Sequence, residues 1–148
     1  MPEAALTEAR SRTLAAAAAR ILPSGDGPGA AETGVAACCE GAMLHPCFRG
    51  LRPGLESVLD WLQSRALGLH ATDFAACAPG EQDEVLRALE QDPNPMLRFL
   101  FRWLVELSVE GYLGDPVHGG NRDFLGWGAV GARAEDLRSG LCLGARED

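Results

Sequence analysis

The chain has 148 residues, of which 47% are hydrophobic and 23% charged, so it is long enough to bury a core and has the composition of a globular protein. Its formal net charge of −8 argues against a nucleic-acid backbone or an anionic membrane surface as partner. All of the basic residues are arginine, and we attribute this to a bias in the coding sequence rather than to a function.

The first two helices are predicted from apolar residues that recur at every third or fourth position. One helix begins near Thr7 and ends before Pro23, and the segment 23–29 that follows is rich in turn residues. The same spacing predicts a second helix around 35–43. Its adjacent cysteines, Cys38 and Cys39, would then lie on or near a buried face.

Two further helices are predicted to begin at prolines, which fit the first turn of a helix. The third begins at Pro53 and carries an apolar face as far as Leu69. After a short turn that buries Phe74, the fourth begins at Pro79 and ends in the segment 91–95.

A fifth helix is predicted over 95–110, with Asn94 as its cap. It is apolar around most of its circumference, and only Arg98, Arg102 and Glu106 form a polar edge. A helix of this kind is usually buried on nearly all sides. It is therefore either the central helix of the fold or a helix that needs a partner to cover its second face. Since Arg98, Arg102 and Glu106 also interrupt it, we do not expect it to span a membrane.

The segment after this helix, EGYLGDPVHGGNRDFLGW (110–127), is the most unusual in the chain. We expect Gly111 and Gly114 to take left-handed conformations that end the helix. Asp115-Pro116 and the residues 119–121 then form two turns. The segment lacks the glycine pattern and the lysine of a phosphate-binding loop. An ordered loop of this kind usually presents a surface.

Other chemistry is weakly supported. Cys38, Cys39, His45 and Cys47 could be drawn as a metal site, but adjacent cysteines do not have the spacing of zinc ligands. A disulfide between two of the five cysteines stays open. His70 is expected to cap a helix end or to be solvated. We expect no catalytic, cofactor-binding or metal-binding residue in this chain.

The glycine-rich segment nevertheless resembles a known family. Residues 111–131 resemble the signature of the gluconate 2-dehydrogenase subunit 3 family, in which a Gly-aromatic pair is followed by Asp-Pro, by Tyr/His-Gly-Gly-Asn and by Gly-Trp. The matching residues here are Gly111, Tyr112, Asp115, Pro116, His118, Gly119, Gly120, Asn121, Gly126 and Trp127. More weakly, residues 13–35 and 74–89 resemble the opening helix and the middle of that family.

The resemblance implies a small helical accessory subunit without a cofactor of its own. Its partner would be a large FAD-dependent subunit of the glucose–methanol–choline (GMC) oxidoreductase type that oxidises a sugar or alcohol, often with a cytochrome c as third subunit. The small subunit would bind and stabilise the large one and aid its export. The expected location is the periplasm if the pair is exported together, and otherwise the cytoplasm, because no leader of the usual form is recognised.

We therefore predict an all-α fold in which five to six helices form one compact orthogonal bundle. The single domain would span 1–148, with a core at about 7–131 and a tail with a short helical turn at 132–148. The predicted partner-interface residues are Tyr112, Asp115, Pro116, His118, Gly119, Gly120, Asn121, Arg122 and Trp127. The alternative is a stand-alone small enzyme or a ligand- or metal-binding domain that uses His118 and Asp115.

Overall fold

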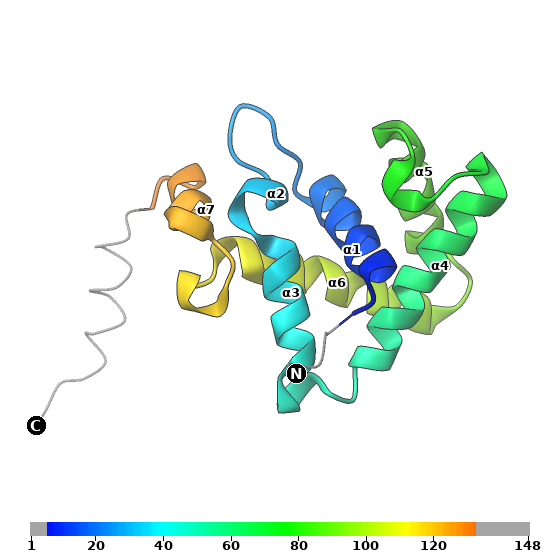
Figure 1. Cartoon of the computed structure of the whole chain (residues 1–148), viewed down its shortest axis with the longest axis horizontal. Coiled ribbons are helices and arrows are strands. Elements are labelled where there is room, and N and C mark those ends of the chain that lie inside the picture. The colour runs from blue at the N-terminus through cyan, green and yellow to red at the C-terminus, as the bar shows by residue number, and fades with distance from the viewer. Residues whose placement is uncertain (1–5, 133–148) are drawn as a thin grey trace, which may run out of the picture.

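The computed structural model describes residues 6–132, which form helices joined by loops and short turns (Figure 1). Within this range the chain has seven α-helices and no β-strand, which confirms the all-α prediction. The α-helices are α1 Glu8–Ile21, α2 Ala30–Thr33, α3 Val35–Leu44, α4 Arg52–His70, α5 Pro79–Glu90, α6 Pro95–Leu113 and α7 Leu125–Ala129. Short 3-10 turns lie at η1 Pro46–Phe48, η2 Phe74–Ala76, η3 Pro116–His118 and η4 Arg122–Phe124.

The helix starts are set by local side-chain chemistry. Thr7 and Asn94 each cap a helix, α1 and α6, because their side-chain oxygens accept a backbone N–H of the first turn. Pro53, Pro79 and Pro95 lie in the first turns of α4, α5 and α6, where a missing N–H costs no helical hydrogen bond. The predicted starts of these helices are therefore confirmed.

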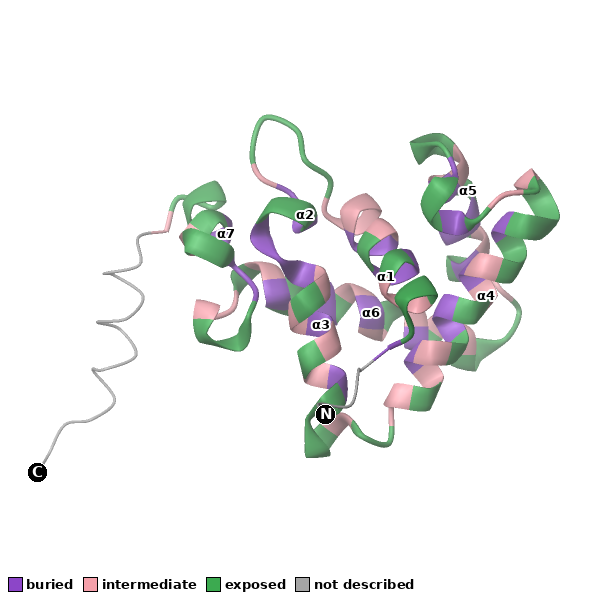
Figure 2. Cartoon of the chain, viewed as in Figure 1, coloured by how far each residue is buried: buried purple, intermediate pink, exposed green. Residues whose placement is uncertain are grey.

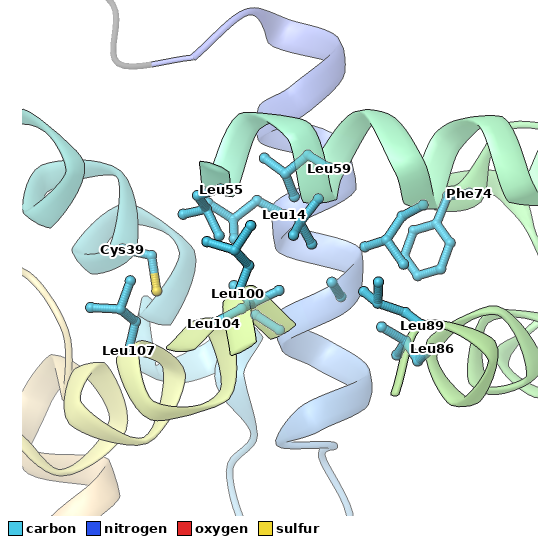
Figure 3. Close-up of a cluster of buried hydrophobic side chains, with 14 of the residues drawn as sticks. Leu14, Cys39, Leu55, Leu59, Phe74, Leu86, Leu89, Leu100, Leu104 and Leu107 are labelled. Atoms are coloured by element: carbon cyan, nitrogen blue, oxygen red, sulfur yellow. The ribbon is translucent and has the colours of Figure 1, made fainter. Parts of the chain in front are cut away.

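One hydrophobic cluster is shared by the longer helices, and α6 packs against α1, α3, α4 and α5. In Figure 3, Cys39 of α3 points toward Leu107 of α6, and Leu14 of α1 lies near Leu55 and Leu59 of α4. Each fully buried leucine contributes about 1.5–3 kcal/mol through removal of its apolar surface from water. The residues labelled in the figure are Leu14, Cys39, Leu55, Leu59, Phe74, Leu86, Leu89, Leu100, Leu104 and Leu107.

Helix α6 has two different faces (Figure 2). Leu100 and Leu104 are buried in the core, whereas the side chains of Met96 and Phe99 are 59% and 49% exposed. Val109 and Leu113 near the other end of α6 are also exposed. Helix α6 is therefore central on one face, and residues 6–132 leave the other face uncovered. That a partner covers this second face stays a prediction.

Ion pairs join α1 to two other helices at the surface. The Arg10 guanidinium contacts the Glu56 and Asp60 carboxylates of α4 at 3.0 and 2.7 Å, and Arg20 contacts Asp83 of α5 at 2.8 Å. Hydrogen bonding to Arg10 and Arg20 lowers the pKa of Asp60 and of Asp83. These carboxylates therefore stay ionised when the chain is folded at neutral pH.

The structure differs from the sequence-based predictions at His70 and at the short helix α2. His70 is neither a cap nor solvated: its side chain is 15% exposed and its Nε2 lies 3.3 Å from the Glu84 carboxylate. The short helix α2 has no periodic signal in the sequence and ends at Gly34, whose φ is +75°. The predicted turn within the tail, beyond residue 132, lies outside the described residues. No helix within residues 6–132 has the length and apolar character needed to cross a bilayer.

Candidate functional site

The glycine-rich segment forms a cap on the C-terminal end of α6, where helical carbonyl groups lack partners from the next turn. The backbone N–H of Asn121 donates to the Gly111 carbonyl at 2.8 Å. The Trp127 indole Nε1 donates to the Leu113 carbonyl at 2.6 Å, and the Asn121 Nδ2 donates to the Gly114 carbonyl at 2.8 Å. Side chains and backbone from the loop thus replace the missing turn of the helix.

Asn121 is the centre of this cap. Its side chain is fully buried, and its Oδ1 accepts backbone N–H groups from Gly126 at 2.8 Å and from Trp127 at 3.3 Å. Its φ of +45° is left-handed, a conformation that asparagine tolerates better than most residues. Asn121 therefore joins the end of α6 to the start of α7.

Two glycines allow the backbone of the loop to touch the backbone of α6. A Cβ at Gly120 would overlap with the carbonyl oxygen of Gly111, and a Cβ at Gly126 would overlap with that of Tyr112. No side chain can be accommodated at either position without moving the backbone. These glycines are needed for close approach, and neither is among the positive-φ residues.

The left-handed positions differ in part from those expected. Gly119 has a φ of +94°, so the predicted turn at 119–121 is confirmed. The left-handed ends predicted at Gly111 and Gly114 are wrong: Gly111 lies inside α6, which continues to Leu113, and Gly114 is extended, with φ −72° and ψ 173°. Gly111 packs against Cys38 of α3, where a Cβ would lie 3.3 Å from the cysteine Cβ, so this glycine allows the two helices to approach closely.

The cap is also tied to the loop that precedes α2. The Tyr112 hydroxyl donates to the Pro28 carbonyl at 2.7 Å. The Arg122 guanidinium lies over Gly34, where a Cβ would be 3.0 Å from its Nη2. The first and last of the three segments that carried the family resemblance therefore meet in space.

The predicted interface residues fall into three groups by burial. Gly120, Asn121 and Trp127 are buried within the chain, with Trp127 only 5% exposed. Tyr112, Asp115 and Pro116 are half-buried, whereas His118, Gly119 and Arg122 are exposed. Their role in an interface stays a prediction. The sequence could not decide whether Trp127 is a core residue, and the structure places it in the cap.

Apolar side chains that the sequence analysis missed are exposed around the cap. Val117 is 79% exposed in the turn after Asp115, and Val130 is 61% exposed after α7. Leu113 and Leu125 are exposed to a smaller extent. The only signal in the sequence was their position as isolated aliphatic residues in a glycine-rich loop.

A groove of about 500 Å³ lies between α3 and the cap, and we call it the α3 groove. It brings together Cys38 and His45 from one segment with Asp115 and His118 from another. The lining residues are Cys38, Cys39, Gly41, Ala42, His45, Phe48, Leu107, Glu110, Gly111, Gly114, Asp115, His118 and Gly120.

The thiols of the groove are poorly suited to nucleophilic chemistry. Burial raises the pKa of the Cys38 thiol, which a hydrogen bond from the Gly120 backbone offsets only in part. Burial also raises the pKa of Cys39 to about 12. Both are therefore protonated at neutral pH, whereas a reactive cysteine needs its thiolate.

The alternative metal and disulfide hypotheses gain no support from residues 6–132. In this range no three His, Cys, Asp or Glu residues are grouped so that they could hold a metal ion, and this covers Cys38, Cys39, His45 and Cys47. The four cysteines of the range are free thiols. Cys142 lies outside the described residues.

The alternative function also relied on Asp115 and His118. Asp115 accepts the backbone N–H of Val117 at 3.0 Å, so it caps the turn that holds His118.

Comparisons with known proteins agree with the resemblance in the sequence. A family model described as Gluconate 2-dehydrogenase subunit 3 matches residues 8–133 of the 148. No curated protein and no solved structure matches the chain. The family match includes α1, the α3 groove and the whole cap.

Proposed function

This chain belongs to the gluconate 2-dehydrogenase subunit 3 family, and from that premise we propose that it is a non-catalytic accessory subunit that binds and stabilises a large dehydrogenase subunit. The family description itself names a subunit of a dehydrogenase. The finer part of the proposal is that the partner is a GMC-type flavoprotein that carries FAD and oxidises a sugar or alcohol. A cytochrome c subunit and joint export complete the proposed assembly.

The observation that carries the proposal is the uncovered face of α6. Met96 and Phe99 are among the largest apolar side chains of the chain, and each is about half exposed. Stable subunit interfaces are large and apolar, often ~2,000 Å² or more in total. Met96 and Phe99 lie three residues apart on α6, so they are neighbours on its surface, as the apolar side chains of a contact surface would be.

The chemistry of the α3 groove favours binding over catalysis. Its two thiols are protonated at neutral pH, and its walls are largely apolar. Asp115 accepts the backbone N–H of Val117, and a residue with this role stabilises a turn. The groove therefore resembles a surface for contact more than a reaction centre.

The test is co-expression with a large flavoprotein of this type, which we expect to be encoded in a neighbouring reading frame. We expect both proteins to gain soluble yield and to elute together in size-exclusion chromatography, with flavin absorbance in the shared peak. The measurement is the molar ratio of flavin to this chain, together with dye-linked oxidation of sugars and alcohols. Two chains that are equally soluble and equally active when expressed separately would contradict the proposal.

Purification of this chain alone distinguishes the proposed function from the alternative, a stand-alone enzyme or metal-binding domain. A small enzyme or metal-binding domain that used His118 and Asp115 would show turnover or bound metal when purified alone. Elemental analysis and activity of the single chain therefore decide between the two functions. Stoichiometric metal that is lost in a His118→Ala variant would favour the alternative.

A further inference from the structure

The α3 groove has walls whose positions are fixed by the cap. One wall is α3 with the turn after it, and the opposite wall is formed by α6 and the start of the cap. Gly120 and Gly111 lie at the junction, and the backbone hydrogen bond from Asn121 to Gly111 holds the two segments together. A volume of about 500 Å³ is within the range of sites that hold a ligand or a side chain of another protein.

The chemistry of the groove is apolar inside and acidic at its edge. Ala42, Phe48 and Leu107 contribute apolar surface, and Phe48 packs on Trp103 with ring centroids 5.9 Å apart. Glu110 and Asp115 add negative charge, and no arginine within residues 6–132 lines the groove. His45 accepts the backbone N–H of Cys47 on its Nδ1 at 3.3 Å. An occupant with one apolar group and a positive charge beside it fits these walls.

We propose that the α3 groove receives an apolar side chain of the large flavoprotein subunit, and that an adjacent arginine or lysine of that subunit pairs with Glu110. The inference rests on the proposed function and identifies where, and by what chemistry, the partner is held. The groove shares Asp115, His118 and Gly120 with the interface predicted from the sequence, and it adds walls from α3 and α6 that the sequence did not indicate.

The first test fills the groove without disturbing the fold. Gly41 lines the groove, is exposed on α3, and has no atom within 4 Å of a Cβ built on it, so Gly41→Trp places a bulky side chain over the groove. Gly68 on α4 is equally open and also exposed, but it lies away from the groove, so Gly68→Trp is the matched control. Both replace a helical glycine and should preserve or raise helix stability.

The readout is the amount of flavoprotein captured per tagged chain after co-expression. Gly41→Trp should reduce capture by about tenfold or more, as loss of a central contact typically does. Gly68→Trp should bind like the wild type. Equal capture by both variants overturns the proposal. If the wild-type chain captures no flavoprotein at all, the proposed function has failed rather than the docking site.

The second test concerns the charge. Glu110→Arg should reduce capture by about fivefold at low salt and by less at high salt. Glu106→Arg, one turn away on the exposed surface of α6 and outside the groove, is the control and should have little effect. Replacing the basic residue of the partner by glutamate should restore binding to Glu110→Arg. Failure of every basic-to-acidic variant of the partner to do so overturns the charge pairing, as does equal loss in Glu106→Arg.

Discussion

The two ends of α6 are held in different ways. Toward its N-terminal end, Leu100 and Leu104 pack side chain to side chain in the core shared with α1, α4 and α5. At its C-terminal end the helix is held by backbone contacts and by hydrogen bonds from Asn121 and Trp127. The core needs apolar volume, and several residues can supply it. The cap needs particular atoms at particular positions, so it should tolerate almost no substitution.

The largest expected effect comes from adding one methyl group to the cap. Gly126→Ala places a Cβ on the carbonyl oxygen of Tyr112, and Gly120→Ala places one on that of Gly111. Each should lower the free energy of unfolding by about 3 kcal/mol or more, because the backbone must separate. Urea denaturation followed by circular dichroism measures the loss. Gly128→Ala in α7, where a Cβ meets no atom within 4 Å, is the control. Equal stability of Gly126→Ala and Gly128→Ala would show that the close approach is not needed.

A smaller loss is expected when Asn121 is replaced. Asn121→Ala removes the side-chain partners of Gly114, Gly126 and Trp127 in a buried place, at a cost of about 2–4 kcal/mol. Leu104→Met in the core keeps the volume and should cost less than about 1.5 kcal/mol. Chemical denaturation of both variants measures the contrast between cap and core. An Asn121→Ala variant no less stable than Leu104→Met would reverse the comparison.

Backbone strain gives the next effect. Gly119→Val forces a β-branched residue into a φ of +94°, which costs about 1–3 kcal/mol. Gly25→Val, in another loop and without a positive φ, should be nearly neutral. We expect Gly119→Val to impair pairing with the flavoprotein more than helix content, as measured by capture and by circular dichroism. Loss of helix content with normal capture would argue against a role of the loop in assembly.

The smallest effect is expected from the surface ion pair between Arg20 of α1 and Asp83 of α5. The side chains of both residues are about a quarter exposed, so Asp83→Asn should cost less than about 1 kcal/mol at neutral pH. Because Arg20 lowers the pKa of Asp83, this stabilisation is complete above the pKa of the unfolded chain, near 4. It is lost as the pH falls through the lower pKa of the folded state. Urea unfolding of the wild type and of Asp83→Asn at about pH 7 and about pH 3 measures this. The free energies of unfolding of the two proteins should differ less at the lower pH. If the difference in free energy of unfolding between the two proteins stayed the same in acid, the charge of Asp83 would not be its source.

The same contrast explains what could be predicted from the sequence. Thr7, Asn94 and Pro95 set helix starts through contacts with their own neighbours, so their effect is visible in a short stretch of sequence. Apolar periodicity likewise located the core side of α1, α3, α4 and α5, but not that of α6, which is apolar around most of its circumference. Both are local properties, and they were sufficient for the fold class.

The features that were missed depend on contacts between distant segments. Gly111 was expected to end the helix, but it lies inside α6 and packs closely against Cys38 of α3, a contact that the local sequence does not reveal. Asn121 was expected at a surface turn, as asparagine after two glycines usually is, yet its side chain is buried. The α3 groove could not be predicted, because its walls come from both halves of the chain.

The hydrogen bonds of the cap affect how much entropy the loop would lose on binding a partner. The carbonyls of Gly111, Leu113 and Gly114 are satisfied inside this polypeptide, so the loop takes its shape when the chain itself folds. A protein that docks here loses little ordering entropy on the loop, and the free energy of association can come from side chains alone. In the proposed assembly, the loop would therefore offer its partner a surface that is already formed.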